Sequence, residues 1–60
     1  MNPNPFLVKV PSDPYENTTV WNRDEAINLC YNLSLDYGHA HVCQYEGPYL
    51  QDVAEFYYGS

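Results

Sequence analysis

Basic residues are almost absent from this 60-residue chain. Lys9 and Arg23 are opposed by eight aspartates and glutamates, which gives a formal net charge of −6. Two basic side chains cannot supply the phosphate contacts that nucleic-acid binding needs. A negative field also repels anionic membranes and attracts basic surfaces. The charge therefore disfavours direct contact with nucleic acid or a membrane and favours a basic partner, unless it only keeps a small protein in solution.

Cysteine and targeting signals are also scarce. Cys30 and Cys43 are too few for a disulfide framework. No apolar run is long enough to span a bilayer. The opening Met-Asn-Pro-Asn-Pro has neither the basic nor the apolar character of a targeting segment. We therefore expect the cytoplasm, with both thiols reduced.

The chain has little length with which to build an enzyme. A domain of 60 residues buries roughly 60% of the surface of its unfolded chain, which leaves little room for a substrate pocket. It is too apolar for a disordered chain, with 45% hydrophobic and 17% aromatic residues. Its seven tyrosines suit both a small core and a contact surface. We expect one domain over residues 1–60, with residues 1–5 as a loose lead-in.

Two strands are predicted in the first third of the chain. Residues 6–10 alternate, so that Phe6, Val8 and Val10 share one face. Residues 12–17 have the composition of a turn. Residues 18–21 are β-branched and aromatic, which fits a second strand antiparallel to the first.

A helix is predicted over residues 23–37. Asn22 with Glu25 three residues later resembles a capping box, and Gly38 suits a left-handed C-cap. One stripe of the helix should face the sheet, and its members are Ala26, Leu29, Cys30, Leu33 and Tyr37.

A second apolar group lies on the outer side of this helix and consists of Ile27, Tyr31 and Leu35. An apolar group on an otherwise polar face suggests a partner or dimer contact. The alternative is that Tyr49 or the C-terminal aromatic residues fold over it.

The last third of the chain predicts a β-hairpin. Residues 39–45 alternate as a third strand and residues 46–49 form a turn. Residues 53–58 are rich in β-formers and favour a fourth strand, although their apolar spacing also fits a helix. The predicted fold class is α+β: an antiparallel sheet of about four strands in the order ββαββ, with one helix packed on one face.

Three potential metal ligands are spaced by two residues along the third strand, namely His39, His41 and Cys43. A strand places such residues on one face, and a fourth ligand could come from Asp36. The spacing differs from the paired ligands of zinc motifs. The alternative is a solvent-facing polar strand surface with Ala40 and Val42 packed inward, so we expect neither metal nor cofactor.

Other catalytic signals are missing from the sequence. Cys30 belongs to the apolar stripe, which predicts a small buried residue, and no third group orients a pair between Cys43 and His41. The three glycines are isolated, so none forms a phosphate-binding loop. We expect no enzyme activity.

The acidic residues are spread over the whole chain and are Asp13, Glu16, Asp24, Glu25, Asp36, Glu46, Asp52 and Glu55. Folded compactly, they could compete for a protein groove that holds a nucleic-acid backbone. In size, acidity and tyrosine content the chain resembles the small phage-encoded inhibitors of bacterial defence, of the anti-CRISPR type that mimics DNA. The resemblance covers the whole chain loosely and rests on no shared motif. It implies a stoichiometric blocker of the target-DNA site on a CRISPR surveillance complex, without catalysis or cofactor, in the bacterial host cell.

Two other hypotheses remain open. The chain could be a structural or regulatory module, a monomer or weak homodimer, that docks or dimerises through Ile27, Tyr31 and Leu35. It could also be a small metal- or thiol-linked protein that uses His39, His41 and Cys43.

Overall fold

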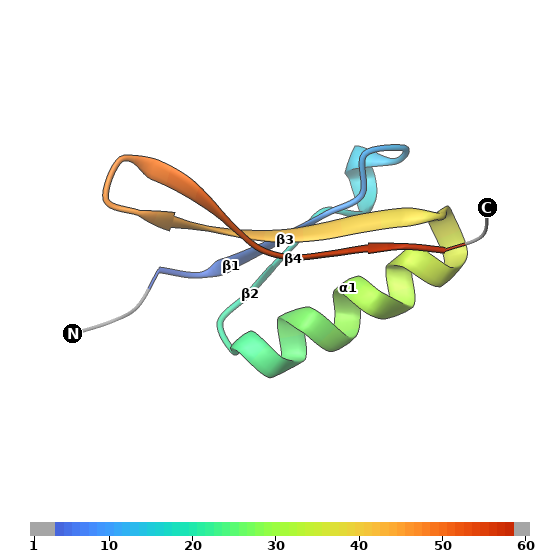
Figure 1. The fold of residues 1–60 in the computed structure, drawn as a ribbon, viewed down its shortest axis with the longest axis horizontal. Helices are drawn as coiled ribbons and strands as arrows, with labels where there is room; N and C mark the ends of the chain where they lie inside the picture. Colours follow the sequence, from blue (N-terminus) through green and yellow to red (C-terminus); the bar gives the residue numbers. More distant parts are fainter. Residues whose placement is uncertain (1–3, 59–60) are drawn as a thin grey trace.

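The computed structural model describes residues 4–58. Its elements, in chain order, are β1 (Phe6–Lys9), the 3-10 helix η1 (Pro14–Glu16), β2 (Thr18–Val20), α1 (Arg23–Tyr37), β3 (His39–Glu46) and β4 (Tyr49–Tyr57). The strands form one sheet in the order β2-β1-β3-β4, and every neighbouring pair is antiparallel. Helix α1 lies along one face of this sheet (Figure 1). The predicted ββαββ fold with one packed helix is confirmed.

Helix α1 begins and ends where the capping residues predict. The Asn22 side-chain oxygen accepts a hydrogen bond from the Glu25 N–H at 2.9 Å. At the other end Gly38 has φ 86°, and its N–H donates to the Ser34 carbonyl at 2.8 Å. These bonds satisfy backbone groups that the helix itself leaves without partners.

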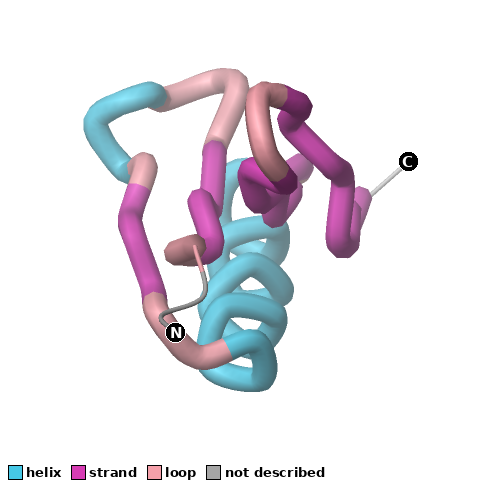
Figure 2. The backbone as a smooth tube through the Cα atoms, turned by 90° about the vertical axis from the view of Figure 1, so that its left-hand side faces the viewer, coloured by secondary structure: helices cyan, strands magenta, loops and turns pink. Residues whose placement is uncertain are grey.

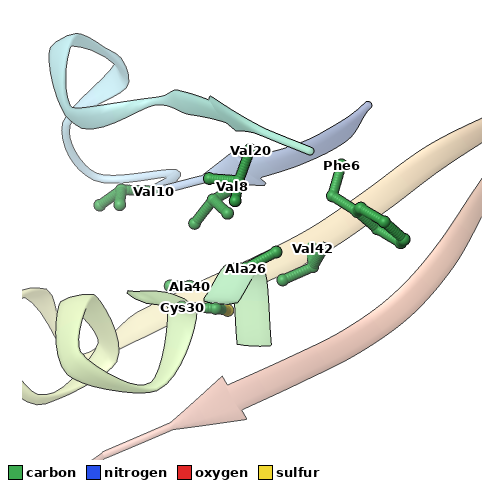
Figure 3. Packing of buried hydrophobic residues seen from close by; sticks show 8 residues of the cluster. All are labelled: Phe6, Val8, Val10, Val20, Ala26, Cys30, Ala40 and Val42. Atoms are coloured by element: carbon green, nitrogen blue, oxygen red, sulfur yellow. The ribbon is translucent and has the colours of Figure 1, made fainter. Parts of the chain in front are cut away.

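The core lies between α1 and the sheet (Figure 3). Its fully or nearly buried apolar residues include Phe6, Val8, Val10, Val20, Ala26, Cys30, Ala40 and Val42. The predicted inward alternation of both central strands is therefore confirmed.

The buried row of α1 differs from the prediction at its C-terminal end. Ala26, Cys30 and Ser34 are the buried residues of the helix, at intervals of four, and all three are small. The buried Ser34 hydroxyl donates to the Tyr31 carbonyl at 2.6 Å, so its polar group is satisfied. Tyr37 was predicted in this stripe, but it is 37% exposed because it lies in the last turn of the helix.

Strands β1 and β2 are each one residue shorter than predicted. The turn between them contains η1, whose first N–H groups are capped by Asp13: its side chain accepts from the Tyr15 N–H at 3.2 Å. The Asn17 side chain accepts from the Val10 N–H at 2.8 Å, which closes the loop onto the end of β1. These side-chain bonds replace a tight hairpin turn.

Strands β3 and β4 form a long hairpin that extends beyond the helix (Figure 1). The strand interpretation of the C-terminal residues is confirmed, but β4 begins at Tyr49 and not at residue 53. The predicted turn narrows to Gly47 and Pro48, and Gly47 has φ 61°, which favours glycine. The pairing slips by one residue next to Val42 and Cys43, which marks a β-bulge.

Asn4 and Pro5 of the predicted lead-in precede β1 without regular secondary structure, and Asn4 is hydrogen-bonded to β3. Its side-chain amide donates to the Tyr45 carbonyl at 2.7 Å, and its own carbonyl accepts from the Gln44 amide at 2.7 Å. Residues 1–3 of the predicted lead-in lie outside the described residues. Across residues 4–58, no helix has the length and apolar character needed to cross a bilayer.

Candidate functional site

The sheet face opposite α1 carries a row of cross-strand pairs, and we call it the open face. Lys9 lies opposite His41, His41 opposite Glu55, and His39 opposite Tyr57. Since Ala40 and Val42 point into the core, their neighbours on β3 point to this other side. Polar side chains from three strands therefore meet on the open face.

A compact cluster on the open face is centred on His39. The His39 ring stacks on Tyr57 with centroids 4.2 Å apart and planes 4° from parallel, and the His41 ring follows at 5.9 Å. His39 Nε2 lies 2.7 Å from Glu55 Oε2. The hydrogen bond from His39 lowers the pKa of the Glu55 carboxyl, so this acid is held in its charged form by its own chain.

The metal hypothesis required His39, His41 and Cys43 to stand together. The two histidines do, but Cys43 is fully buried, and its Sγ–H donates to the Leu7 carbonyl at 3.7 Å. The expectation that Cys43 faces solvent is therefore wrong, because β1 and β4 enclose it at the bulge. No group of three or more His, Cys, Asp or Glu side chains that could hold a metal ion occurs within residues 4–58.

Both cysteine thiols are buried and have raised pKa values. Burial, with a smaller contribution from the charge of Glu55, raises the pKa of Cys30 to about 11. Burial also raises the pKa of Cys43, although Lys9 opposes it. Cys30 packs on the helix side of the sheet and Cys43 pairs with Leu7 on the other, so the sheet separates them. The described part of the chain encloses no pocket.

Three acidic residues act on the side chain of Tyr37, and we call them the loop–helix acidic cluster: Asp13, Glu16 and Asp36. The pKa of Tyr37 is raised first by burial and then by Glu16, Asp13 and Asp36. Asp13 and Glu16 come from the η1 loop, whereas Asp36 and Tyr37 come from the last turn of α1. Acids that are far apart in the sequence therefore act on one side chain in the folded chain.

The remaining acids occupy three other places along a molecule of 39 × 20 × 19 Å. Asp24 and Glu25 lie in the first turn of α1, where they complement the helix dipole. Glu46 ends β3 beside the hairpin turn, while Asp52 and Glu55 belong to β4. Three of the eight predicted acidic residues thus act on Tyr37, and the others are distributed over the molecule.

Almost none of these acids has a basic partner among residues 4–58. Within this range the one close contact between a basic and an acidic side chain is His39–Glu55, and neither Lys9 nor Arg23 makes one. Seven of the eight acids therefore have no basic side chain beside them within residues 4–58.

The outer helix group is partly covered by the chain itself. The Phe56 ring of β4 meets Tyr31 edge-to-face, with centroids 5.6 Å apart and planes at 80°. Tyr31 remains 50% exposed and Leu35 37%, whereas Ile27 is half-buried. The expectation that Ile27 points largely outward is thus wrong, and the C-terminal aromatic residues do reach this group.

Sequence reasoning missed two features of the β3–β4 hairpin. It did not place Tyr57 and Glu55 beside His39, because the bulge sets that register. It also missed that β4 is a nine-residue strand, one side of which pairs with no other strand of residues 4–58. The β-forming composition from Tyr49 onward was the available signal for the second feature.

Comparison with known proteins returns no family model, curated protein or solved structure that matches this chain.

Proposed function

We propose that this chain is a non-catalytic binding protein that covers a basic nucleic-acid-binding surface of a bacterial defence complex, in the manner of anti-CRISPR proteins that mimic DNA. One observation carries the proposal: seven of eight acids have no cationic partner within residues 4–58. A carboxylate that no cation neutralises contributes its full charge to the electric field around the protein. This field speeds association with a basic partner and favours basic surfaces over others.

The loop–helix acidic cluster is the proposed centre of contact. Asp13 and Glu16 of the η1 loop and Asp36 of α1 all act on the side chain of Tyr37. A tyrosine among carboxylates suits a contact surface, because its ring buries apolar area while its hydroxyl stays wet. The position of Asp24 and Glu25 at the N-terminus of α1 is explained by their favourable interaction with the helix dipole. We therefore place them outside the proposed contact.

The absence of catalysis belongs to the proposal. Both thiols have raised pKa values, which disfavours the thiolate that a cysteine nucleophile needs. Two free cysteines suit a reducing compartment, so we propose the cytoplasm of the bacterial host cell if the chain is phage-encoded.

The test is a competition experiment on two guide-loaded complexes, Cas9 and a multisubunit surveillance complex. A labelled target duplex is displaced by the chain and by a variant that combines Asp13→Asn, Glu16→Gln and Asp36→Asn. These changes remove three charges and keep each side chain's shape. We expect near-stoichiometric displacement of the duplex from at least one complex by the unchanged chain, and little by the variant.

The matched control combines Asp24→Asn with Glu25→Gln, which removes charge at the other end of α1. This control is expected to displace the duplex nearly as well as the unchanged chain. Failure of the unchanged chain to displace duplex from either complex at low salt would overturn the proposal.

Docking or dimerisation through Ile27, Tyr31 and Leu35 is a second candidate, because Tyr31 and Leu35 stay exposed. Light scattering distinguishes this second candidate from the proposed binding to a basic surface. A dimer that Tyr31→Asp converts to a monomer supports the second candidate, whereas a monomer whose partner binding weakens with salt supports the first.

A further inference from the structure

Strand β4 ends the sheet, and its far side has no neighbour among the described residues (Figure 2). It is nine residues long, from Tyr49 to Tyr57, and all nine pair with β3 on one side apart from the bulge. Long edge strands present a row of free backbone N–H and C=O groups that can pair with another chain. Natural edge strands are usually short, charged, bulged or covered. Strand β4 is long and has no cover among the described residues, and its one bulge leaves Val53 between two regular stretches.

The pairing pattern identifies which backbone groups are free. The Tyr58 N–H donates to the Gly38 carbonyl at 2.9 Å, so this residue pair is hydrogen-bonded toward β3. Antiparallel pairs alternate, which turns the N–H and C=O groups of Glu55 and Tyr57 away from β3. On the other side of the bulge, the pair Glu46–Tyr49 that closes the two-residue turn is hydrogen-bonded, and the pairs alternate from there. The N–H and C=O groups of Leu50 and Asp52 therefore also point away from β3.

Different side chains flank the two sides of this edge. On the helix side Phe56 contacts Tyr31, and Ile27 and Leu35 lie one turn before and after Tyr31 on the same helix ridge. We call these four residues the apolar shelf. On the open-face side the edge carries Asp52 and Glu55 in the middle of the strand, with Leu50 and Tyr57 toward its two ends. An added strand would therefore meet apolar side chains on one face and two central carboxylates on the other.

A second copy of this chain fits the edge poorly. Self-pairing that uses both free stretches of β4 would set Asp52 of one copy opposite Glu55 of the other, twice, on the same face. Like charges directly opposite one another destabilise a strand pair. Each copy also brings a net charge of −6.

We infer that the β4 edge accepts an extended basic segment of the partner protein as a fifth strand. Alternate apolar side chains of that segment pack on the apolar shelf, and the lysines or arginines between them lie beside Asp52 and Glu55. Main-chain hydrogen bonds to Leu50, Asp52, Glu55 and Tyr57 hold the segment, as in other strand-addition complexes. The basic character of the segment rests on the proposed function, whereas the strand pairing rests on the free edge.

The test uses two synthetic peptides. The first is the capped heptapeptide Lys-Val-Lys-Val-Lys-Val-Lys, and the second has the first and third valines replaced by proline. Both carry the same charge, but proline removes N–H donors and disfavours a regular strand pair. Binding to the ¹⁵N-labelled chain is followed by amide shifts and hydrogen exchange.

We expect the alternating peptide to slow hydrogen exchange of the Leu50, Asp52, Glu55 and Tyr57 amides at least about tenfold, with shifts at Tyr31. The proline peptide should leave these amides unprotected. Combining Asp52→Asn with Glu55→Gln should weaken binding of the alternating peptide roughly fivefold, and the matched Asp24→Asn, Glu25→Gln variant less than twofold.

Three results would overturn the inference. Equal binding of both peptides without protection of the β4 amides would leave only general attraction to the acidic surface, which preserves the proposed function and rejects strand addition. Binding of neither peptide at low salt would reject both. The third result is slower hydrogen exchange of the same β4 amides in the absence of peptide, at increasing protein concentration. This result would show that the edge pairs with a second copy of the chain.

Discussion

Glu55 on β4 and His39 on β3 form a diagonal pair on the open face, with Glu55 Oε2 2.7 Å from His39 Nε2. Tyr57 stacks on the same imidazole ring, which fixes its orientation. The pair ties the two strands together near the C-terminal end of β4. The Glu55 side chain stays half exposed beside this contact.

The hydrogen bond from His39 predicts how stability changes with pH. The pKa of Glu55 is lowered from its ordinary value of 4.5 in the folded state. A lowered carboxyl pKa contributes stability that is present above the ordinary value and is lost as the pH falls through the folded value. We expect Glu55→Gln to lower the urea midpoint at pH 6 and to have a steadily smaller effect as the pH falls below the ordinary value of 4.5, because the carboxylate is lost as it becomes protonated in the folded state too.

A His39→Gln background is the control for that experiment. Without the imidazole, Glu55→Gln should change the urea midpoint much less at pH 6, because the pair no longer exists. An unchanged effect of Glu55→Gln in this background would show that Glu55 acts through another contact.

The caps of α1 predict the effect of two substitutions on thermal stability. Asn22→Ala removes the acceptor of the Glu25 N–H and should cost about 1 kcal/mol, or roughly 4–8 °C in Tm. Gly38→Ala should cost about 1 kcal/mol because φ is 86°. Space is not the reason, since an added Cβ would lie 3.8 Å from the nearest atom, the Tyr58 carbonyl oxygen.

Asn28→Ala is the matched control, because Asn28 is exposed within α1 and makes no cap. Calorimetry should find its Tm equal to that of the unchanged chain or slightly higher. A similar loss for Asn22→Ala and Asn28→Ala would contradict the assignment of Asn22 as the cap.

The thiols should resist modification in the folded chain. Cys30 has a pKa of about 11, so at pH 8 its thiolate is roughly one part in a thousand. Cys43 is also fully buried with a raised pKa. We expect a disulfide reagent to label both cysteines only at the rate of unfolding, and at once in denaturant; rapid labelling of the folded chain would refute this.

The contact between Tyr31 and Phe56 should be measurable as a coupling energy. Their edge-to-face geometry predicts about 1 kcal/mol in a double-mutant cycle of Tyr31→Ala and Phe56→Ala. Pairing Phe56→Ala with Leu7→Ala, on the other face of the sheet, should give a coupling near zero. A zero coupling for Tyr31 and Phe56 would mean that β4 does not cover the helix group.

Patterns among neighbouring residues in the sequence were sufficient to predict much of the fold. The bounds of α1 follow from Asn22 and Gly38, because capping is decided by neighbouring residues. The inward faces of β1 and β3 follow from strict alternation. The burial of Ser34 was missed because a search for apolar residues passes over serine. Ser34 can be buried because its hydroxyl bonds to a carbonyl of its own helix.

The pairing of the hairpin could not be read from the sequence. Counted back from the two-residue turn, an uninterrupted hairpin would put Glu55 opposite Ala40, on the core side. The bulge beside Val42 shifts the register by one, which brings Glu55 opposite His41 on the open face and Phe56 into contact with the core. A bulge depends on packing of both faces and leaves no local signature here.

The loop–helix acidic cluster was equally hidden. Asp13 and Glu16 lie 23 and 20 residues before Asp36, and only the folded chain brings all three within electrostatic range of Tyr37. The sequence predicted the amount of negative charge, and the tertiary fold decides where it is concentrated.

The central claim is tested most directly by the affinity of the chain for a guide-loaded complex without DNA, measured at about 50 and about 200 mM salt. The unchanged chain should bind tightly at the lower salt and much more weakly at the higher. Combining Asp13→Asn, Glu16→Gln and Asp36→Asn should lower affinity at low salt at least about tenfold and flatten the salt dependence. Equal affinities for the unchanged chain and this variant, with no effect of salt, would contradict the account.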